Sequence, residues 1–281
     1  ADQIFEALMG YRGVFSTRIA YITDAEGTYE LQVADADGQN PLGVLSAQEP
    51  IISPAWSPDG SELAYVSFEN GRPGIYIQEL ATGRRERVVG FPGINGAPAW
   101  SPDGQRLAVT LSKDGDPEIY IYERATGGLH RITNHYAIDT EAAWAPDGRS
   151  LLFTSDRSGG PQIYQVPTSG GTPRRITFDA GNYNARASFS PDGGSVTFVT
   201  RSDRGYHIAV LELASGKHRV LTDGRLDESP SFAPNGKSII YTTTQSGREM
   251  LATVSVDGRI RQQLAVEQVR VREPAWSPFL N

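Results

Sequence analysis

A motif of up to seven residues occurs six times at intervals of 43 to 45 residues, and this repeat constrains the fold more than any other feature. Its first copy, residues 54–60, reads Pro-Ala-Trp-Ser-Pro-Asp-Gly, and every copy has a proline at the fifth position. Those prolines are Pro58, Pro102, Pro146, Pro191, Pro234 and Pro278. A constant period of this length indicates a repeat architecture, in which each unit is one supersecondary structure stacked on its neighbours.

Each repeat unit predicts four short strands. Ser-Pro-Asp-Gly is favourable β-turn chemistry, and the Trp or Phe before it suits packing between sheets. In the first full unit, apolar or alternating segments follow at 63–66, 75–77 and 87–89. The fourth strands of the next three units are predicted at 131–133, 175–177 and 219–221. Four strands in about 44 residues are typical of a propeller blade rather than of a helical solenoid.

The chain ends determine the number of blades. Residues 274–278 form a first strand with nothing after it, whereas residues 18–22 form a second strand with nothing before it. Third and fourth strands follow at 29–33 and 42–45. The sequence therefore predicts an all-β, six-bladed β-propeller of four-stranded antiparallel blades, in which N- and C-terminal strands close the last blade. We expect a short helix and linker over 1–17 and the propeller over 18–281.

Composition excludes several classes of function. A net charge of −7 disfavours nucleic acid as a partner, and the absence of cysteine excludes thiolate nucleophiles and cysteine-ligated metals. No run of 18 apolar residues occurs, so direct membrane insertion is not expected. Residues 1–17 have no long apolar stretch, so no signal peptide is expected within this segment.

No sequence motif indicates catalysis. The aspartates of the Ser-Pro-Asp-Gly turns recur from blade to blade, which is typical of a structural role. The chain has neither Gly-x-Ser-x-Gly nor Gly-x-Gly-x-x-Gly, and Gly236-Lys237-Ser238 lacks the earlier glycine of a phosphate-binding loop. We therefore expect a non-enzymatic protein without a cofactor, although carboxylates lining the channel could hold an adventitious cation.

The segments that join successive blades are the longest and least repetitive, and function concentrates in irregular loops on a regular scaffold. They combine charges of both signs with apolar residues such as Phe91, Ile94, Tyr136 and Ile138, which suits a protein or peptide interface. The predicted loops are Phe91–Ala97, Asn134–Glu141, Phe178–Arg186, Asp223–Ser229 and Val266–Glu273.

Several of these segments resemble the propeller of the TolB family, periplasmic components of the Tol–Pal system of Gram-negative bacteria. The resemblance covers nearly the whole chain. It is carried by the Pro-Ala-Trp-Ser-Pro-Asp-Gly repeats and by the more specific segments 18–21, 91–98, 139–141, 226–228 and 274–278.

The resemblance implies a periplasmic, non-enzymatic module that binds the Pal lipoprotein at the channel mouth, where group A colicins insert a disordered segment. It assigns Pal binding to Ala97 and Thr140, and to Ile94 at a position where the family often has histidine. Asn95, His135 and Glu141 are expected contacts by position only. The N-terminal α/β domain of the family is not found in residues 1–281. We expect a monomer.

Two other interpretations stay open at this stage. The chain could be the propeller of a prolyl-oligopeptidase-like hydrolase, whose relatives share generic Ser-Pro-Asp-Gly repeats but need a separate catalytic domain. It could also be a propeller lactonase or another metal-dependent enzyme with ligands in the channel, which predicts a tightly bound metal.

Overall fold

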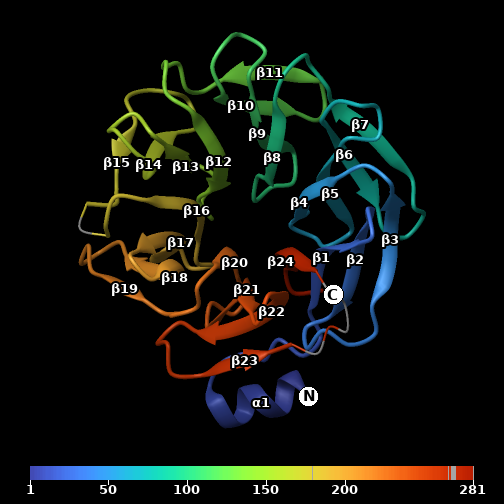
Figure 1. The fold of residues 1–281 in the computed structure, drawn as a ribbon, viewed down its shortest axis with the longest axis vertical. Coiled ribbons are helices and arrows are strands. Elements are labelled where there is room, and N and C mark those ends of the chain that lie inside the picture. The colour runs from blue at the N-terminus through green and yellow to red at the C-terminus, as the bar shows by residue number, and fades with distance from the viewer. Residues whose placement is uncertain (179, 265, 267–269, 281) are drawn as a thin grey trace.

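Six four-stranded antiparallel sheets surround a central axis in a computed structural model that describes residues 1–281 except 179, 265, 267–269 and 281 (Figure 1). The all-β, six-bladed propeller predicted from the repeat is confirmed. In each blade the strand that carries the aromatic motif lies innermost, and the chain then proceeds outward (Figure 1).

The strands of the six blades have the following bounds. The first complete blade contains β4 (Ile51–Trp56), β5 (Glu62–Ser67), β6 (Gly74–Glu79) and β7 (Arg85–Val89). The second contains β8 (Asn95–Trp100), β9 (Arg106–Leu111), β10 (Glu118–Glu123) and β11 (Gly128–Arg131). The third contains β12 (Asp139–Trp144), β13 (Ser150–Ser155), β14 (Gln162–Pro167) and β15 (Arg174–Arg175). The fourth contains β16 (Asn184–Phe189), β17 (Ser195–Ser202), β18 (Gly205–Glu212) and β19 (His218–Val220). The fifth contains β20 (Asp227–Phe232), β21 (Ser238–Gln245), β22 (Arg248–Ser255) and β23 (Arg261–Gln263).

The sixth blade joins the two ends of the chain. Strand β24 (Val271–Trp276) pairs with β1 (Arg18–Ala25), which is followed by β2 (Thr28–Asp35) and β3 (Leu42–Ala47). Ile19 lies opposite Trp276, and the amide of Ser277 donates to the carbonyl of Arg18 at 2.9 Å. The ring therefore closes through main-chain hydrogen bonds, as the incomplete first and last units predicted.

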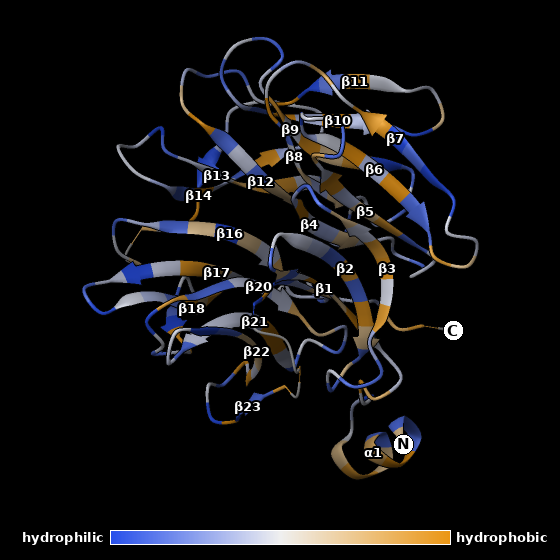
Figure 2. Cartoon of the chain, turned by 45° about the vertical axis from the view of Figure 1, so that its right-hand side comes forward, coloured by the Kyte–Doolittle hydropathy of each residue, from blue (hydrophilic) through white to orange (hydrophobic). Residues whose placement is uncertain are grey.

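The hydrophobic core lies between neighbouring blades, where apolar strands face each other (Figure 2). The buried motif aromatics contribute to it, and three of the tryptophans also bond to the innermost strand of the preceding blade. Trp144 Nε1 donates to the Ala99 carbonyl at 3.0 Å, and Trp100 Nε1 donates to the Ala55 carbonyl at 3.1 Å. The repeated aromatic residue thus fixes each blade to its neighbour as well as filling the space between them.

The outermost strands are shorter than predicted in the middle blades. Residues 132–133, 176–177 and 221 lie outside β11, β15 and β19, so the sequence prediction was wrong there. In each of these three blades a threonine hydroxyl accepts a hydrogen bond from an amide of the third strand: Thr133 from Ile119 N, Thr177 from Ile163 N and Thr222 from Ile208 N. A side-chain oxygen thereby replaces a ladder carbonyl, and the backbone turns away. Val89 occupies the equivalent position in β7 and has no hydroxyl, and β7 continues to this residue.

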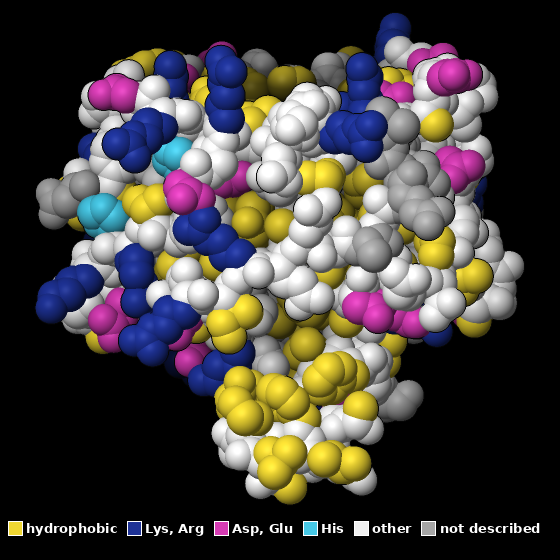
Figure 3. Space-filling view, turned by 60° about the horizontal axis from the view of Figure 1, so that its bottom comes forward, with side chains coloured by type: hydrophobic (Ala, Val, Ile, Leu, Met, Phe, Trp, Pro, Cys, Tyr) yellow, Lys and Arg dark blue, Asp and Glu magenta, His cyan; other side chains and the backbone are white. Residues whose placement is uncertain are grey.

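A short helix, α1 (Asp2–Met9), precedes the propeller and projects from its edge, with hydrophobic side chains gathered on it (Figure 3). It ends at Gly10, which has a left-handed backbone (φ 77°). Asp2 anchors the following linker by accepting from the Phe15 amide at 2.9 Å. Among the described residues, no helix has the length and apolar character needed to cross a membrane.

Candidate functional site: the channel mouth

Each innermost strand carries a β-bulge at the same place. The residue three positions before the motif aromatic has a positive φ in all six strands, although none of these residues is glycine. They are Ser53, Ala97, Glu141, Arg186, Ser229 and Glu273. Because a bulge redirects the strand and its side chains, these six residues form a ring near the start of each innermost strand, at the end of the channel where successive blades are joined.

This ring changes the assignment of several predicted site residues. Ala97, Thr140 and Glu141 were predicted in loops, but they lie on β8 and β12, and the joining loops end before them. All three line a cavity of about 390 Å³ at this end of the channel, together with Arg186 and Glu273. The Thr140 hydroxyl lies 3.3 Å from that of Thr110 on the neighbouring blade. The small side chains of Ala97 and Thr140 leave the mouth open.

Arg186 connects the walls of this cavity. Its Nε donates to Glu141 Oε1 at 2.8 Å, its Nη2 to Glu273 Oε1 at 3.4 Å, and its Nη1 to the hydroxyl of Ser229. Although burial opposes the shift, Glu273 and Glu141 raise the pKa of Arg186, so it stays charged. The guanidinium therefore bridges four innermost strands and pairs with two carboxylates inside the channel.

Asn95 and Ile94 lie next to each other but face different surroundings. Asn95 is buried, and its side chain accepts from the Phe91 amide at 2.8 Å and donates to the Phe91 carbonyl at 2.7 Å. It therefore shapes the loop from within. Ile94 is 47% exposed at the tip of that loop, and its amide donates to Ser112 Oγ at 2.8 Å. Ile94 can touch a partner directly, whereas Asn95 holds Ile94 in position.

His135 lies in the next joining loop. Its amide donates to the fully buried Glu118 carboxylate, which also accepts from Arg131 Nη2 at 2.7 Å. The Nδ1 of His135 accepts from the Ala137 amide at 3.0 Å, and its ring lies 4.2 Å from the ring of Tyr136. These contacts leave Tyr136 80% exposed beside His135.

Exposed apolar side chains gather around this end of the channel. Two adjacent joining loops contribute Phe91, Ile94, Tyr136 and Ile138. Exposed aromatic and aliphatic groups beside a polar channel are the composition expected of a protein-binding surface. Of the predicted joining loops, Asp179 and residues 267–269 lie outside the described residues.

The described residues contain no group of three or more His, Asp or Glu side chains placed to hold a metal ion. The channel carboxylates Glu141 and Glu273 are instead bound to Arg186. The mouth therefore combines exposed apolar side chains at the rim with an arginine that is paired to two carboxylates within.

Sequence reasoning missed the linking role of Arg186. The residue was noted only as one of several charges in the joining loops. Aligning the six motifs on their aromatic residue would have placed Arg186 at the same position as Glu141 and Glu273. Equivalent positions around a closed ring face one channel, so that alignment would have predicted their proximity.

Comparison with known proteins identifies the family. The family model described as TolB beta propeller domain matches residues 5–280. The chain is 62% identical to the Tol-Pal system proteins TolB of Xanthomonas campestris and Xanthomonas oryzae, over 99% of its own length and 65% of theirs. Its structure is similar to the crystal structure of TolB from Acinetobacter baumannii, with a TM-score of 0.94, 48% identity, and coverage of 99% of this chain and 70% of that one. The chain therefore belongs to the TolB family, of which it comprises the β-propeller domain.

Proposed function

We propose that this propeller binds the globular domain of the Pal lipoprotein at the channel mouth, in the periplasm, as a non-enzymatic part of the Tol–Pal system. The observation that carries the proposal is the open mouth itself. Ala97 and Thr140 line a cavity of about 390 Å³, and exposed apolar side chains of two joining loops stand beside it. A partner could place side chains in the cavity and cover the rim.

The rim supplies the apolar part of the proposed interface. Ile94 and Tyr136 are exposed, yet their backbones are held by hydrogen bonds to Ser112 and within the loop anchored on Glu118. Side chains on a fixed backbone lose little conformational freedom on binding, which favours affinity. Ile94 has no titratable group, so this position would not make binding depend on pH.

The channel supplies the polar part. Glu141 was expected to contact Pal, but both of its carboxylate oxygens accept hydrogen bonds from Arg186, and Oε2 also accepts from Thr154 Oγ1 at 3.0 Å. We therefore assign Glu141 to shaping the mouth, with Ala97 and Thr140 as the direct contacts. An extended colicin segment would use the same opening. A peptide is narrow enough to enter the channel, whereas a folded domain can only lie over its mouth.

The alternative functions have less support. The matching family model is that of TolB propellers, and the channel carboxylates are engaged by an arginine rather than free to bind a metal. We therefore do not propose hydrolase, lactonase or metal-dependent activity for this domain.

Titration calorimetry with the soluble Pal domain of Xanthomonas campestris tests the proposal. We expect saturable binding that Ala97→Trp weakens at least tenfold, because the bulky ring fills the mouth. Ala125→Trp is the matched control, since Ala125 is an exposed alanine in the turn between β10 and β11 at the opposite end. Absence of heat at tens of micromolar protein, or equal binding by both variants, would overturn the proposal.

A further inference from the structure

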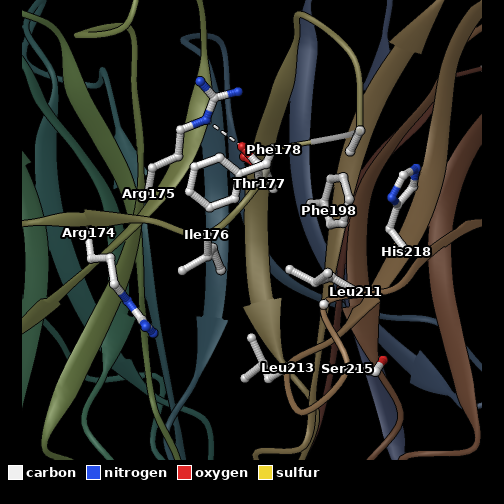
Figure 4. A pocket seen from close by; sticks show the side chains of 12 residues that line it. Arg174, Arg175, Ile176, Thr177, Phe178, Phe198, Leu211, Leu213, Ser215 and His218 are labelled. Carbon is white, nitrogen blue, oxygen red and sulfur yellow. Dashed lines mark hydrogen bonds between the residues drawn. The ribbon is translucent and has the colours of Figure 1, made fainter.

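A groove on the outer wall of the propeller separates the third and fourth blades and has no role in the function proposed above. It has a volume of about 370 Å³ and lies between the segment that begins at β15 and the outer part of β18 and β19 (Figure 4). We call it the β15–β19 groove. Its main side chains are Arg174, Arg175, Ile176, Phe178, Phe198, Leu211, Leu213 and His218.

The groove is open because β15 is only two residues long. After Arg175, the Thr177 hydroxyl accepts from Ile163 N at 3.1 Å and also donates to the Gln162 side chain at 2.7 Å. The chain therefore leaves the edge of the sheet, and Phe178 is 68% exposed. The floor is apolar: Phe198 and Leu211 are buried, and Ile176 and Leu213 are half-buried.

The equivalent cleft between the first and second blades has different chemistry. Its lining contains three arginines and three glutamates, namely Arg84, Arg85, Arg124, Glu62, Glu79 and Glu86. Arg124 donates to Glu62 at 2.9 Å and lies over the Trp100 ring at 4.9 Å. In the β15–β19 groove, Leu213 occupies the position of Arg124, so neither the ion pair nor the cation–π contact is formed there.

Among the described residues, the formally charged side chains that line the β15–β19 groove are both arginines. Arg174, Arg175 and His218 line it, and the described lining includes no Asp or Glu. Within the described part of the chain, none of these three side chains belongs to an ion pair. Arg174 donates to Gln165 at 3.3 Å, and Arg175 donates to the Thr177 carbonyl. Two arginines with no ion-pair partner among the described residues are unexpected here, because the whole chain has a net charge of −7.

The hydrogen-bonding side chains and the apolar floor of the groove lie next to each other. The two arginines lie on one side and His218 on the other, with Ile176, Phe198, Leu211 and Leu213 between them (Figure 4). The Arg175 guanidinium also lies 5.4 Å from the Phe178 ring centre. A ligand that matches this arrangement carries a large apolar group with carboxylates on both sides of it.

We propose that the β15–β19 groove binds an acidic peptide segment of a partner protein, with one or two large apolar side chains on the floor and flanking carboxylates on Arg174, Arg175 and His218. A peptide fits better than a small anion, since apolar side chains form the floor between the two arginines and His218. The site lies on the outer wall rather than at the channel mouth, so it can be occupied together with the proposed Pal site.

Fluorescence anisotropy with a labelled peptide tests the proposal. The probe is Asp-Glu-Leu-Phe-Glu-Asp with an amidated end, and its matched control is Asn-Gln-Leu-Phe-Gln-Asn. We expect the acidic probe to bind at least tenfold more tightly than the amide probe, and its affinity to fall as salt is raised. Equal binding of the two probes, or no binding of the acidic probe at millimolar protein, would overturn the proposal.

Two variants locate the site. Arg174→Gln removes an exposed cation, and Leu213→Glu places a carboxylate on the apolar floor, where it repels an acidic peptide. Each variant is expected to lower the affinity for the acidic probe at least fivefold. Arg84→Gln, in the equivalent cleft, is the control and should have no effect. Unchanged affinity in both test variants would contradict the assignment, and unaltered Pal binding in them would separate this site from the channel mouth.

Discussion

The two ends of the propeller differ in how regular their connecting segments are. At one end, five of the six blades have the same kind of turn. Asp59 accepts from Ser57 and from the Ser61 amide, and Asp103 accepts from Ser101 and from the Gln105 amide in the same way. At the other end, successive joining loops differ in length, charge and apolar content. The repeated end therefore serves the scaffold, whereas the variable end and its channel mouth can recognise a partner.

The two ends also differ in the partners of their charged side chains. The turn carboxylates stay near the surface and accept local hydrogen bonds, so each turn is complete within its own blade. At the channel mouth, Arg186 reaches Glu141 and Glu273 on other blades. The turn aspartates Asp59 and Asp103 therefore stabilise single turns, while Arg186 at the mouth connects several blades.

Replacing a repeated aromatic residue should have the largest effect. Trp144→Ala removes a buried ring between two blades and is expected to lower the free energy of unfolding by about 3 to 5 kcal/mol. Urea denaturation measures this. Trp144→Phe should cost only about 1 kcal/mol, because it loses the bond to Ala99 but keeps the packing found with Phe189 and Phe232. Equal losses for the two variants would contradict a packing role.

Removing the channel ion pairs should cause the second largest loss of stability. Arg186→Met leaves Glu141 and Glu273 without their cation and is expected to cost about 2 kcal/mol, less than a fully buried pair because 36% of the arginine side chain is exposed. Arg259→Met, which removes an exposed pair with Asp257 at the turn end, should leave stability unchanged within error. Similar urea midpoints for the two variants would contradict the view that ion pairs at the channel mouth stabilise the fold more than those at the turn end.

A rim residue should affect binding and not folding. Tyr136→Ala is expected to lower the affinity for the Pal domain about tenfold in calorimetry. The urea midpoint should stay the same, because the ring is largely exposed. Ile260→Ala, which removes an exposed apolar side chain at the turn end, is the control and should leave affinity unchanged. If only Ile260→Ala lowered the affinity, the Pal interface would lie at the turn end, which would contradict the proposal.

The turn carboxylates should have the smallest effect. Hydrogen bonds from Ser101 and the Gln105 amide hold the pKa of Asp103 below its ordinary value of 3.8. The resulting stabilisation is present above pH 3.8 and is lost as the pH falls through the lowered pKa. It should be below about 0.5 kcal/mol, since the side chain is mostly exposed. Asp103→Asn should remove this acid dependence in urea titrations at pH 3 and pH 7, yet keep the turn, as Asn235 does in its own blade. An unchanged acid dependence would contradict this role.

How far the sequence predicts the molecule differs between the two ends. The motif prolines, the aromatic residues and the split last blade were enough to predict six blades, because each signal is local and repeated. The positive φ of Ala97 and Glu141 has no such signal, since neither residue is glycine. The bulges that put them in the channel wall were therefore missed.

The contacts of Arg186 were missed for a related reason. Its partners Glu141 and Glu273 are 45 and 87 residues away in the chain and meet only when the ring closes. Asn95 was predicted as a contact from its place in the loop, but its side chain bonds to its own loop, which depends on how that loop folds. Position in the sequence predicted the joining loops, but not which of their side chains are exposed and which bond within the protein.

Hydrogen exchange of the chain with and without the soluble Pal domain can assign Pal binding to one end of the propeller, because it reports on both ends in one measurement. We expect Pal to slow amide exchange over residues 91–98 and 134–142 and to leave exchange in the turns at 58–61, 102–105 and 146–149 unchanged. Protection confined to those turns, or no protection in either region at saturating Pal, would contradict this expectation.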